Sequence, residues 1–125
     1  IKNSLQSIDV TTDLSLLGRI FMNLLDNAVQ YSPSMGTIHW SIMCDQSPKR
    51  KYTIAVYDEG SGFSKTGLLH AKEEFYRDDE SRNGHSHYGM GLYIVGQLAD
   101  VCGLSLKISN NPETHGAMIE IGGLC

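Results

Sequence analysis

The stretch that most constrains how this chain can fold runs from Leu14 to Ser32. Its apolar residues recur at helical spacing and Pro33 follows it, so we predict one long helix over these residues. Three polar residues precede the helix as capping candidates, namely Thr11, Thr12 and Asp13. The apolar positions cover more than half of the circumference, so we expect a mostly buried helix that packs through Leu17, Ile20, Phe21, Leu24, Leu25, Ala28 and Val29.

The remaining side of this helix carries a polar stripe that consists of Arg19, Asn23, Asp26, Asn27 and Gln30. Solvent-facing stripes usually contain Lys and Glu, whereas Asn is a mediocre helix former because its amide competes for backbone hydrogen bonds. Asn23 and Asn27 are four residues apart and project their amides in the same direction. Two interpretations remain open from the helix alone: the amides cap or bridge neighbouring elements, or an amide oxygen ligates a hard cation such as Mg²⁺.

The composition is that of one globular domain. The chain has 125 residues and 41% hydrophobic content, which is enough for one core. A net charge of −4 argues against a nucleic-acid surface, and no run approaches the roughly 18 apolar residues of a membrane span. The three cysteines lack metal-ligand spacing, and we expect Cys44 and Cys102 to be buried thiols of a reducing compartment. The first residue is not Met, so we expect a piece of a longer protein.

Hydrophobic patterns further along the chain predict a second helix and several strands. Alternation predicts strands at Thr37–Cys44, Tyr52–Asp58, Leu104–Ser109 and Gly116–Ile121, with a weak edge strand within Ile1–Val10. Residues Asp45–Lys51 are expected to form a hairpin loop, Ser64–Glu74 a partly helical connection, and Asp78–Ser86 a long surface loop of the kind that often acts as a lid. Helical spacing then runs from Leu92 to Cys102 and stops at Gly103. This order predicts an α/β (α+β) two-layer sandwich with a mixed, mainly antiparallel sheet.

Two places in this pattern are candidates for binding. Asp58 is in phase with the inward-facing Ile54 and Val56, and a buried carboxylate needs a partner, which either a backbone amide or a ligand can supply. Gly60 and Gly62 follow directly and form either an ordinary glycine turn or a backbone that approaches a flat ligand.

The second candidate is the glycine-rich start of the later helix, at Gly89 and Gly91. Backbone N–H groups and the helix dipole favour a phosphate there, although glycines at such a place can also serve close packing.

Four motifs, taken in order, resemble the N, G1, F and G2 boxes of the sensor histidine kinases. They are Asn23-Leu24-Leu25-Asp26-Asn27-Ala28, Asp58-x-Gly60-x-Gly62, Phe75-Tyr76-Arg77 and Gly89-Met90-Gly91-Leu92. These kinases share a superfamily with DNA gyrase, heat-shock chaperone and mismatch-repair ATPases. The resemblance extends from about Asp13 to Ile121 and implies the Bergerat ATP-binding fold.

The resemblance also implies a role for individual residues. Asn27 would ligate a Mg²⁺ ion that bridges the ATP phosphates, with Asn23 beside it. Asp58 would accept a hydrogen bond from the adenine amino group. The rest of the adenine pocket would consist of Tyr31, stacked on the base, and of Gly60 and Gly62. The phosphates would be bound by the backbone of Gly89, Gly91 and Leu92, and by Arg77 or Arg82.

By resemblance, residues 1–125 form a single catalytic domain that donates the ATP γ-phosphoryl group to a histidine on a separate dimerisation domain, which in turn serves a response regulator. Such a domain would be the cytoplasmic part of a membrane-anchored bacterial sensor, with no nucleic-acid or membrane contact of its own. No dimerisation helix precedes Asp13, so we expect hardly any turnover by this segment alone.

Two alternatives share the fold that the resemblance implies. One is a non-catalytic nucleotide sensor, favoured by Gln30, which stands where Lys or Arg commonly contacts phosphate. The other is an anti-sigma-type serine kinase, against which the Phe75-Tyr76-Arg77 motif argues. Two further differences from the family pattern are His87-Tyr88 before the G2 box and Ala117, in place of Thr, in the last box.

Overall fold

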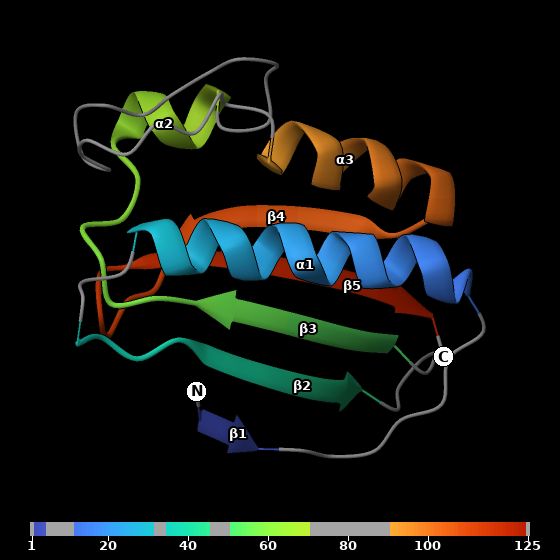
Figure 1. Ribbon diagram of the computed structural model, residues 1–125, viewed down its shortest axis with the longest axis horizontal. Coiled ribbons are helices and arrows are strands. Elements are labelled where there is room, and N and C mark those ends of the chain that lie inside the picture. The colour runs from blue at the N-terminus through green and yellow to red at the C-terminus, as the bar shows by residue number, and fades with distance from the viewer. Residues whose placement is uncertain (1, 5–11, 32–34, 46–50, 71–90, 125) are drawn as a thin grey trace.

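The computed structural model describes residues 2–4, 12–31, 35–45, 51–70 and 91–124. Three helices and five strands lie within these ranges (Figure 1). In chain order they are β1 (Lys2–Ser4), α1 (Leu14–Tyr31), β2 (His39–Asp45), β3 (Lys51–Tyr57), α2 (Lys65–His70), α3 (Gly91–Cys102), β4 (Ser105–Asn110) and β5 (Ala117–Leu124). No described helix combines the length and the apolarity that crossing a bilayer requires.

The five strands form one sheet in the order β1-β2-β3-β5-β4. Only β1 pairs in parallel, at the edge beside β2, and the other three pairings are antiparallel. Asp45 lies opposite Lys51, so β2 and β3 form the predicted hairpin. The prediction of a mixed, mainly antiparallel sheet is therefore confirmed.

The long helix α1 begins at Leu14, where the sequence predicts, and is described to Tyr31; the predicted last residue, Ser32, lies outside the described residues. Of the capping candidates, Asp13 has the position of the N-cap, because its Oδ1 accepts a hydrogen bond from Leu16 N at 3.1 Å. At the other predicted helix stop, Gly103 has a φ of 69°. Leu104 N donates to Ala99 O and Gly103 N donates to Asp100 O, which is a Schellman ending of α3.

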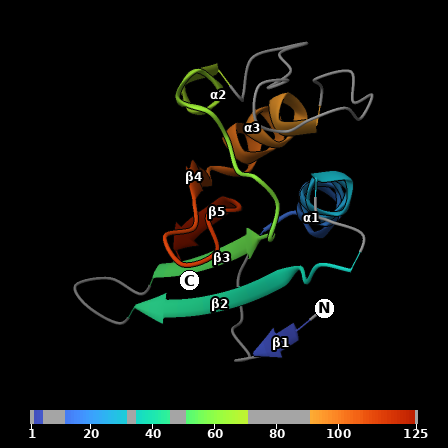
Figure 2. The same ribbon diagram turned by 90° about the vertical axis from the view of Figure 1, so that its left-hand side faces the viewer.

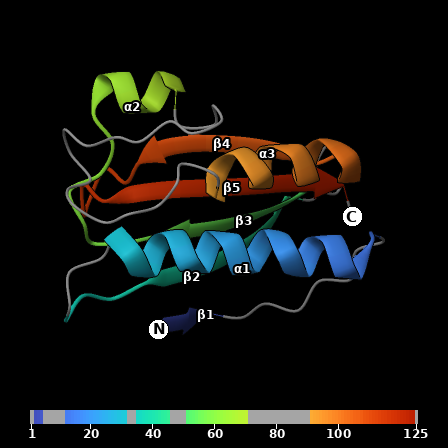
Figure 3. The same cartoon turned by 45° about the horizontal axis from the view of Figure 1, so that its top comes forward.

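Helices α1 and α3 cover the same face of the sheet, which makes the molecule a two-layer sandwich (Figure 2). They lie side by side and pack against each other along the strands (Figure 3). The core between the layers is made of apolar side chains from both helices, from β3 and β5, and from Phe63. Its buried members are Ile20, Leu24, Ala28, Val56, Phe63, Leu92, Val95, Ala117, Ile119 and Ile121.

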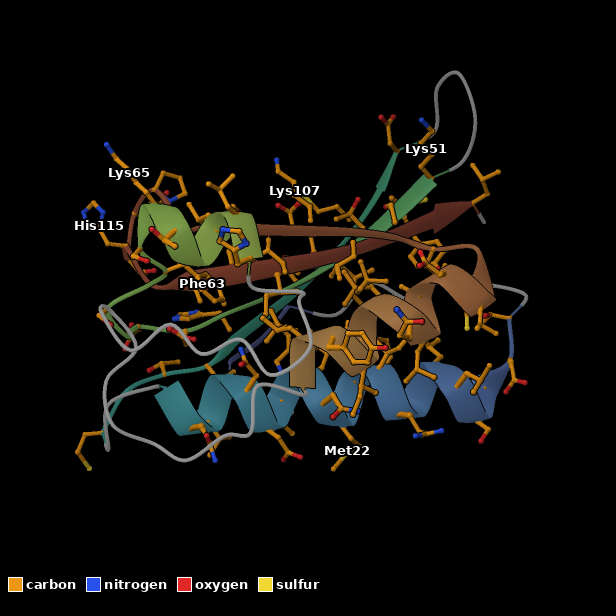
Figure 4. All side chains as sticks on the ribbon, turned by 90° about the horizontal axis from the view of Figure 1, so that it is seen from above. Met22, Lys51, Phe63, Lys65, Lys107 and His115 are labelled. Carbon is orange, nitrogen blue, oxygen red and sulfur yellow. The ribbon has the colours of Figure 1, made fainter. Side chains whose placement is uncertain are left out.

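Helix α1 is less buried than its sequence predicts. Val29, expected on the buried side, is 58% exposed, as is Met22, while Leu14 is 81% exposed. Figure 4 shows Met22 on the side of α1 that faces away from the sheet. Among the described elements no third layer covers that side, so only the face toward the sheet and the flank toward α3 are buried. Cys44 and Cys102 are likewise half-buried rather than buried, and neither forms a disulfide with the other.

Candidate functional site

Asp58 is the most buried charged residue of the candidate site, with 1% of its surface exposed. It directly follows β3, and its inward orientation agrees with the predicted phase. Its Oδ1 accepts hydrogen bonds from Gly60 N at 2.8 Å and from Ala117 N at 3.3 Å. Two backbone amides thus hold this carboxylate oxygen in place.

The two turns that meet at this point pack backbone against backbone. Gly62 has a φ of 76°, and a Cβ there would meet His115 O and would lie 2.8 Å from Asn110 Oδ1. A Cβ on Gly116 would likewise collide with Asp58 O. Glycine is therefore required at both positions, because any side chain there would collide with the backbone of the facing turn and push the two turns apart. In Figure 4, Phe63 and His115 lie together at one end of the sheet, with Lys51 at the other.

The residues after β3 are also tied to β2. Glu59 Oε1 accepts a hydrogen bond from Thr37 N at 2.9 Å, and its Oε2 lies 3.5 Å from His39 Nε2. The His39 ring stacks on Tyr57, with 4.6 Å between ring centroids and 3° between planes. The turn that carries Asp58 is consequently held on the β2 side by the contacts of Glu59 and on the β5 side by the backbone of Ala117.

The polar stripe of α1 is divided between solvent and interior. Arg19 and Asp26 are exposed, whereas Asn27 is only 8% exposed and makes no side-chain hydrogen bond to another described residue. Gln30 Oε1 is also buried, and it accepts no hydrogen bond from any residue that the structure describes. Asn23 Nδ2 donates to Arg19 O at 2.8 Å, so this amide is engaged within its own helix.

Helix α3 starts beside the C-terminal half of α1 (Figures 1 and 3). Gly91 is its first residue, and Leu92 is buried in the core at 7% exposure. The first turn of a helix presents N–H groups that have no partner within the helix. These donors lie at the positive end of the α3 dipole.

Several predicted site residues cannot be placed. Arg77, Arg82 and Gly89, the Phe75-Tyr76-Arg77 motif and the expected lid Asp78–Ser86 lie outside the described residues. Tyr31 is the last residue of α1, and the position of its side chain is likewise outside the description. Among the side chains that are described, no three of His, Cys, Asp or Glu converge to hold a metal ion.

Sequence reasoning missed the contribution of the turn between β4 and β5. Asn111 Oδ1 accepts hydrogen bonds from Glu113 N and Thr114 N, which folds this turn upon itself. Thr114 Oγ1 then donates to Asp58 O at 3.2 Å. The available signal was two adjacent asparagines before Pro112, because Asn side chains favour such turns.

The family model and the curated relatives that this chain matches indicate the same family. Residues 12–122 match the family described as "Histidine kinase-, DNA gyrase B-, and HSP90-like ATPase". The chain is 40% identical to the sensor histidine kinase SpaK of Bacillus subtilis over 78% of this chain and 21% of SpaK. It is 30% identical to the sensor protein SphS of Synechococcus elongatus over 90% of this chain and 28% of SphS. The chain thus spans about a fifth to just over a quarter of the length of these relatives.

Solved structures agree with this family. The mycobacterial sensor histidine kinase MprB superposes with a TM-score of 0.74 at 29% identity, over 88% of this chain and 72% of that one. Full-length ShkA in complex with AMPPNP has a TM-score of 0.69 over 86% of this chain and 21% of that one, and at 21% identity it supports the fold alone. The chain therefore belongs to the histidine kinase-, DNA gyrase B- and HSP90-like ATPase family, as an ATP-binding catalytic domain of the sensor histidine kinase type.

Proposed function

We propose that this domain binds Mg²⁺-ATP with the adenine at Asp58 and the phosphates between α1 and the start of α3. The observation that carries the proposal is the buried Asp58 carboxylate, which backbone amides of Gly60 and Ala117 hold in one orientation. A fixed carboxylate of this kind suits the adenine amino group, which is a hydrogen-bond donor. Residues 12–122 match an ATPase family, which supports a nucleotide here.

Asn27 fits the role of metal ligand. Its side chain is buried and makes no hydrogen bond to another described residue, and an amide oxygen is a suitable ligand for a hard cation. A bound Mg²⁺ ion would neutralise phosphate charge, which is important here because Gln30 provides none. Asn23, one turn earlier on α1, would lie beside the phosphates.

The phosphates would accept hydrogen bonds from backbone N–H groups at Gly89, Gly91 and Leu92, at the positive end of α3. Tyr31 would stack on the base, Gly60 and Gly62 would line its pocket, and Arg77 or Arg82 would contact the phosphate tail. These assignments rest on the motifs of the family.

In the complete protein, we infer transfer of the γ-phosphoryl group to a histidine on a dimerisation domain. The bond between the γ-phosphorus and ADP breaks while a phosphorus–nitrogen bond forms, and the imidazole loses a proton. The relatives that support this step are bacterial sensor kinases several times longer than the segment matched here. We accordingly propose a cytoplasmic domain of a membrane-anchored bacterial sensor that phosphorylates a response regulator.

The test is phosphorylation with ATP labelled on its γ-phosphate, in the full-length protein or with the dimerisation domain supplied separately. We expect acid-labile phosphohistidine that depends on Mg²⁺ and disappears in Asn27→Ala. Nucleotide binding without transfer to any supplied acceptor would instead identify a nucleotide sensor. An acid-stable phosphoserine on a partner would indicate the serine-kinase alternative.

A further inference from the structure

Asn110, the last residue of β4, makes a two-point contact with the backbone of Phe63. Its Oδ1 accepts a hydrogen bond from Phe63 N at 2.8 Å, and its Nδ2 donates to Phe63 O at 2.9 Å. The two residues are 47 positions apart in the sequence. The side-chain amide therefore pairs with the main chain of Phe63 through both of its polar atoms, as a neighbouring strand would.

The same amide also shapes the residue before Phe63. Asn110 Oδ1 lies 2.8 Å from the place where a Cβ of Gly62 would be. This contact leaves room only for glycine, which also adopts the positive φ of this position without the steric cost that a Cβ would bring. Asn110 thus fixes a segment that has little intrinsic rigidity.

The turn from Asp58 to Phe63 is held at both ends. At its start, Asp58 and Ala117 exchange hydrogen bonds, since Asp58 N donates to Ala117 O and Ala117 N donates to the carboxylate. At its end, the Phe63 ring is buried in the core and Asn110 holds the Phe63 main chain. The amide of Gly60 lies between these two anchors and donates to Asp58 Oδ1.

We propose that Asn110 is a positioning residue for base recognition: by fixing Gly62 and Phe63 it keeps the Asp58 carboxylate and the glycine backbone in the geometry that reads adenine. The proposal rests on the proposed function, because it concerns the same pocket. A turn with two glycines that lacked this anchor would have to be ordered at each binding event, and that cost lowers affinity. Asn110 acts through the turn and has no assigned contact with the nucleotide.

The experiment compares ATP and GTP binding by calorimetry in the wild type, Asn110→Ala and Asn110→Asp. The first variant removes both hydrogen bonds, while the second keeps the acceptor for Phe63 N but sets a carboxylate oxygen against Phe63 O. We expect each to lower the affinity for ATP about tenfold, with much less change for GTP, so that the preference for adenine falls. The matched control is Ile121→Val, a fully buried β5 position that pairs with Ile54 and Leu106 and whose truncation lowers stability.

The ratio of the two affinities separates positioning from mere stabilisation, because a loss of stability alone does not discriminate between bases. If Asn110→Ala and Asn110→Asp lower the melting temperature as Ile121→Val does but keep the wild-type ATP/GTP ratio, the proposal is overturned. It is also overturned if neither Asn110 variant folds, since Asn110 is then a residue of the fold. A wild type that does not prefer ATP would instead refute the adenine site itself.

Discussion

Two hydrogen bonds join Asp58 and Ala117. The Asp58 N–H donates to the Ala117 carbonyl at 3.1 Å, and the Ala117 N–H donates to Asp58 Oδ1 at 3.3 Å. The residues are 59 positions apart, on strand ends that the sheet brings together. The second of these bonds uses the backbone of position 117 and does not depend on its side chain. Alanine at this position is thus compatible with an anchored carboxylate.

The first prediction follows from this pair. Asp58→Asn retains an acceptor oxygen for Gly60 N and Ala117 N, so we expect a nearly unchanged melting temperature. The affinity for ATP should fall by about 1.5–3 kcal/mol, the value of a hydrogen bond to a charged group, and the preference over GTP should shrink. Calorimetry with both nucleotides measures this. Asp58→Ala is the contrasting variant: it deprives both amides of an acceptor and should cost about 2 kcal/mol of folding stability. Equal losses of stability in the two variants would contradict the assignment.

The second prediction concerns Asn27. Because its buried amide makes no hydrogen bond to a described residue and Asn is a poor helix former, Asn27→Ala should leave stability unchanged or raise it by about 0.5 kcal/mol. The affinity for Mg²⁺-ATP should nevertheless fall at least tenfold, which corresponds to about 1.4 kcal/mol. Binding of adenosine, which carries no phosphate, should hardly change.

Chelation of the metal checks the same role independently. With EDTA present, the wild type should bind ATP about as weakly as Asn27→Ala does, and the variant should be insensitive to EDTA. Gln97→Ala, which changes an exposed amide side chain on α3, is the matched control and should behave as the wild type. Wild-type binding that ignores Mg²⁺ would remove Asn27 from the metal site.

The third prediction compares two glycines. Gly62→Ala should destabilise the fold by about 1–3 kcal/mol, because the positive φ is unfavourable for alanine and its Cβ would meet His115 O and Asn110 Oδ1. Gly18→Ala should instead stabilise α1 by about 0.5–1 kcal/mol, since Gly18 is helical, exposed and has no atom within 4 Å of an added Cβ. Urea denaturation of both variants measures the difference. The same sign in the two would show that local contacts do not govern these positions.

The fourth prediction tests the start of α1. Asp13→Ala should lower the free energy of unfolding by about 1 kcal/mol, because Leu16 N loses its acceptor. Asp13→Asn keeps an oxygen in that place and should cost much less. Thermal unfolding, followed by circular dichroism, measures the stability of both variants. If another residue were the N-cap, both variants would be as stable as the wild type.

Local periodicity was sufficient to predict most of the framework. The bounds of α1, the β2–β3 hairpin, the Gly103 stop and the inward orientation of Asp58 all follow from residues within a few positions of one another. Such features depend on backbone preference and on the 3.6- and 2-residue periods of side chains, which the sequence displays directly. The ordered family motifs likewise identify a nucleotide-binding domain from the sequence alone.

Only the tertiary structure decided which partners these residues have. Helical spacing predicts Val29 to be a core residue of α1, yet Val29 is exposed. Helical spacing gives the direction of a side chain, but burial also requires another layer of the described structure on that side. The Asp58 carboxylate is held by Ala117, and Gly62 is confined by Asn110 and His115, all distant in sequence. Strand pairing brings these segments together, and no local pattern encodes the distance at which two turns will meet.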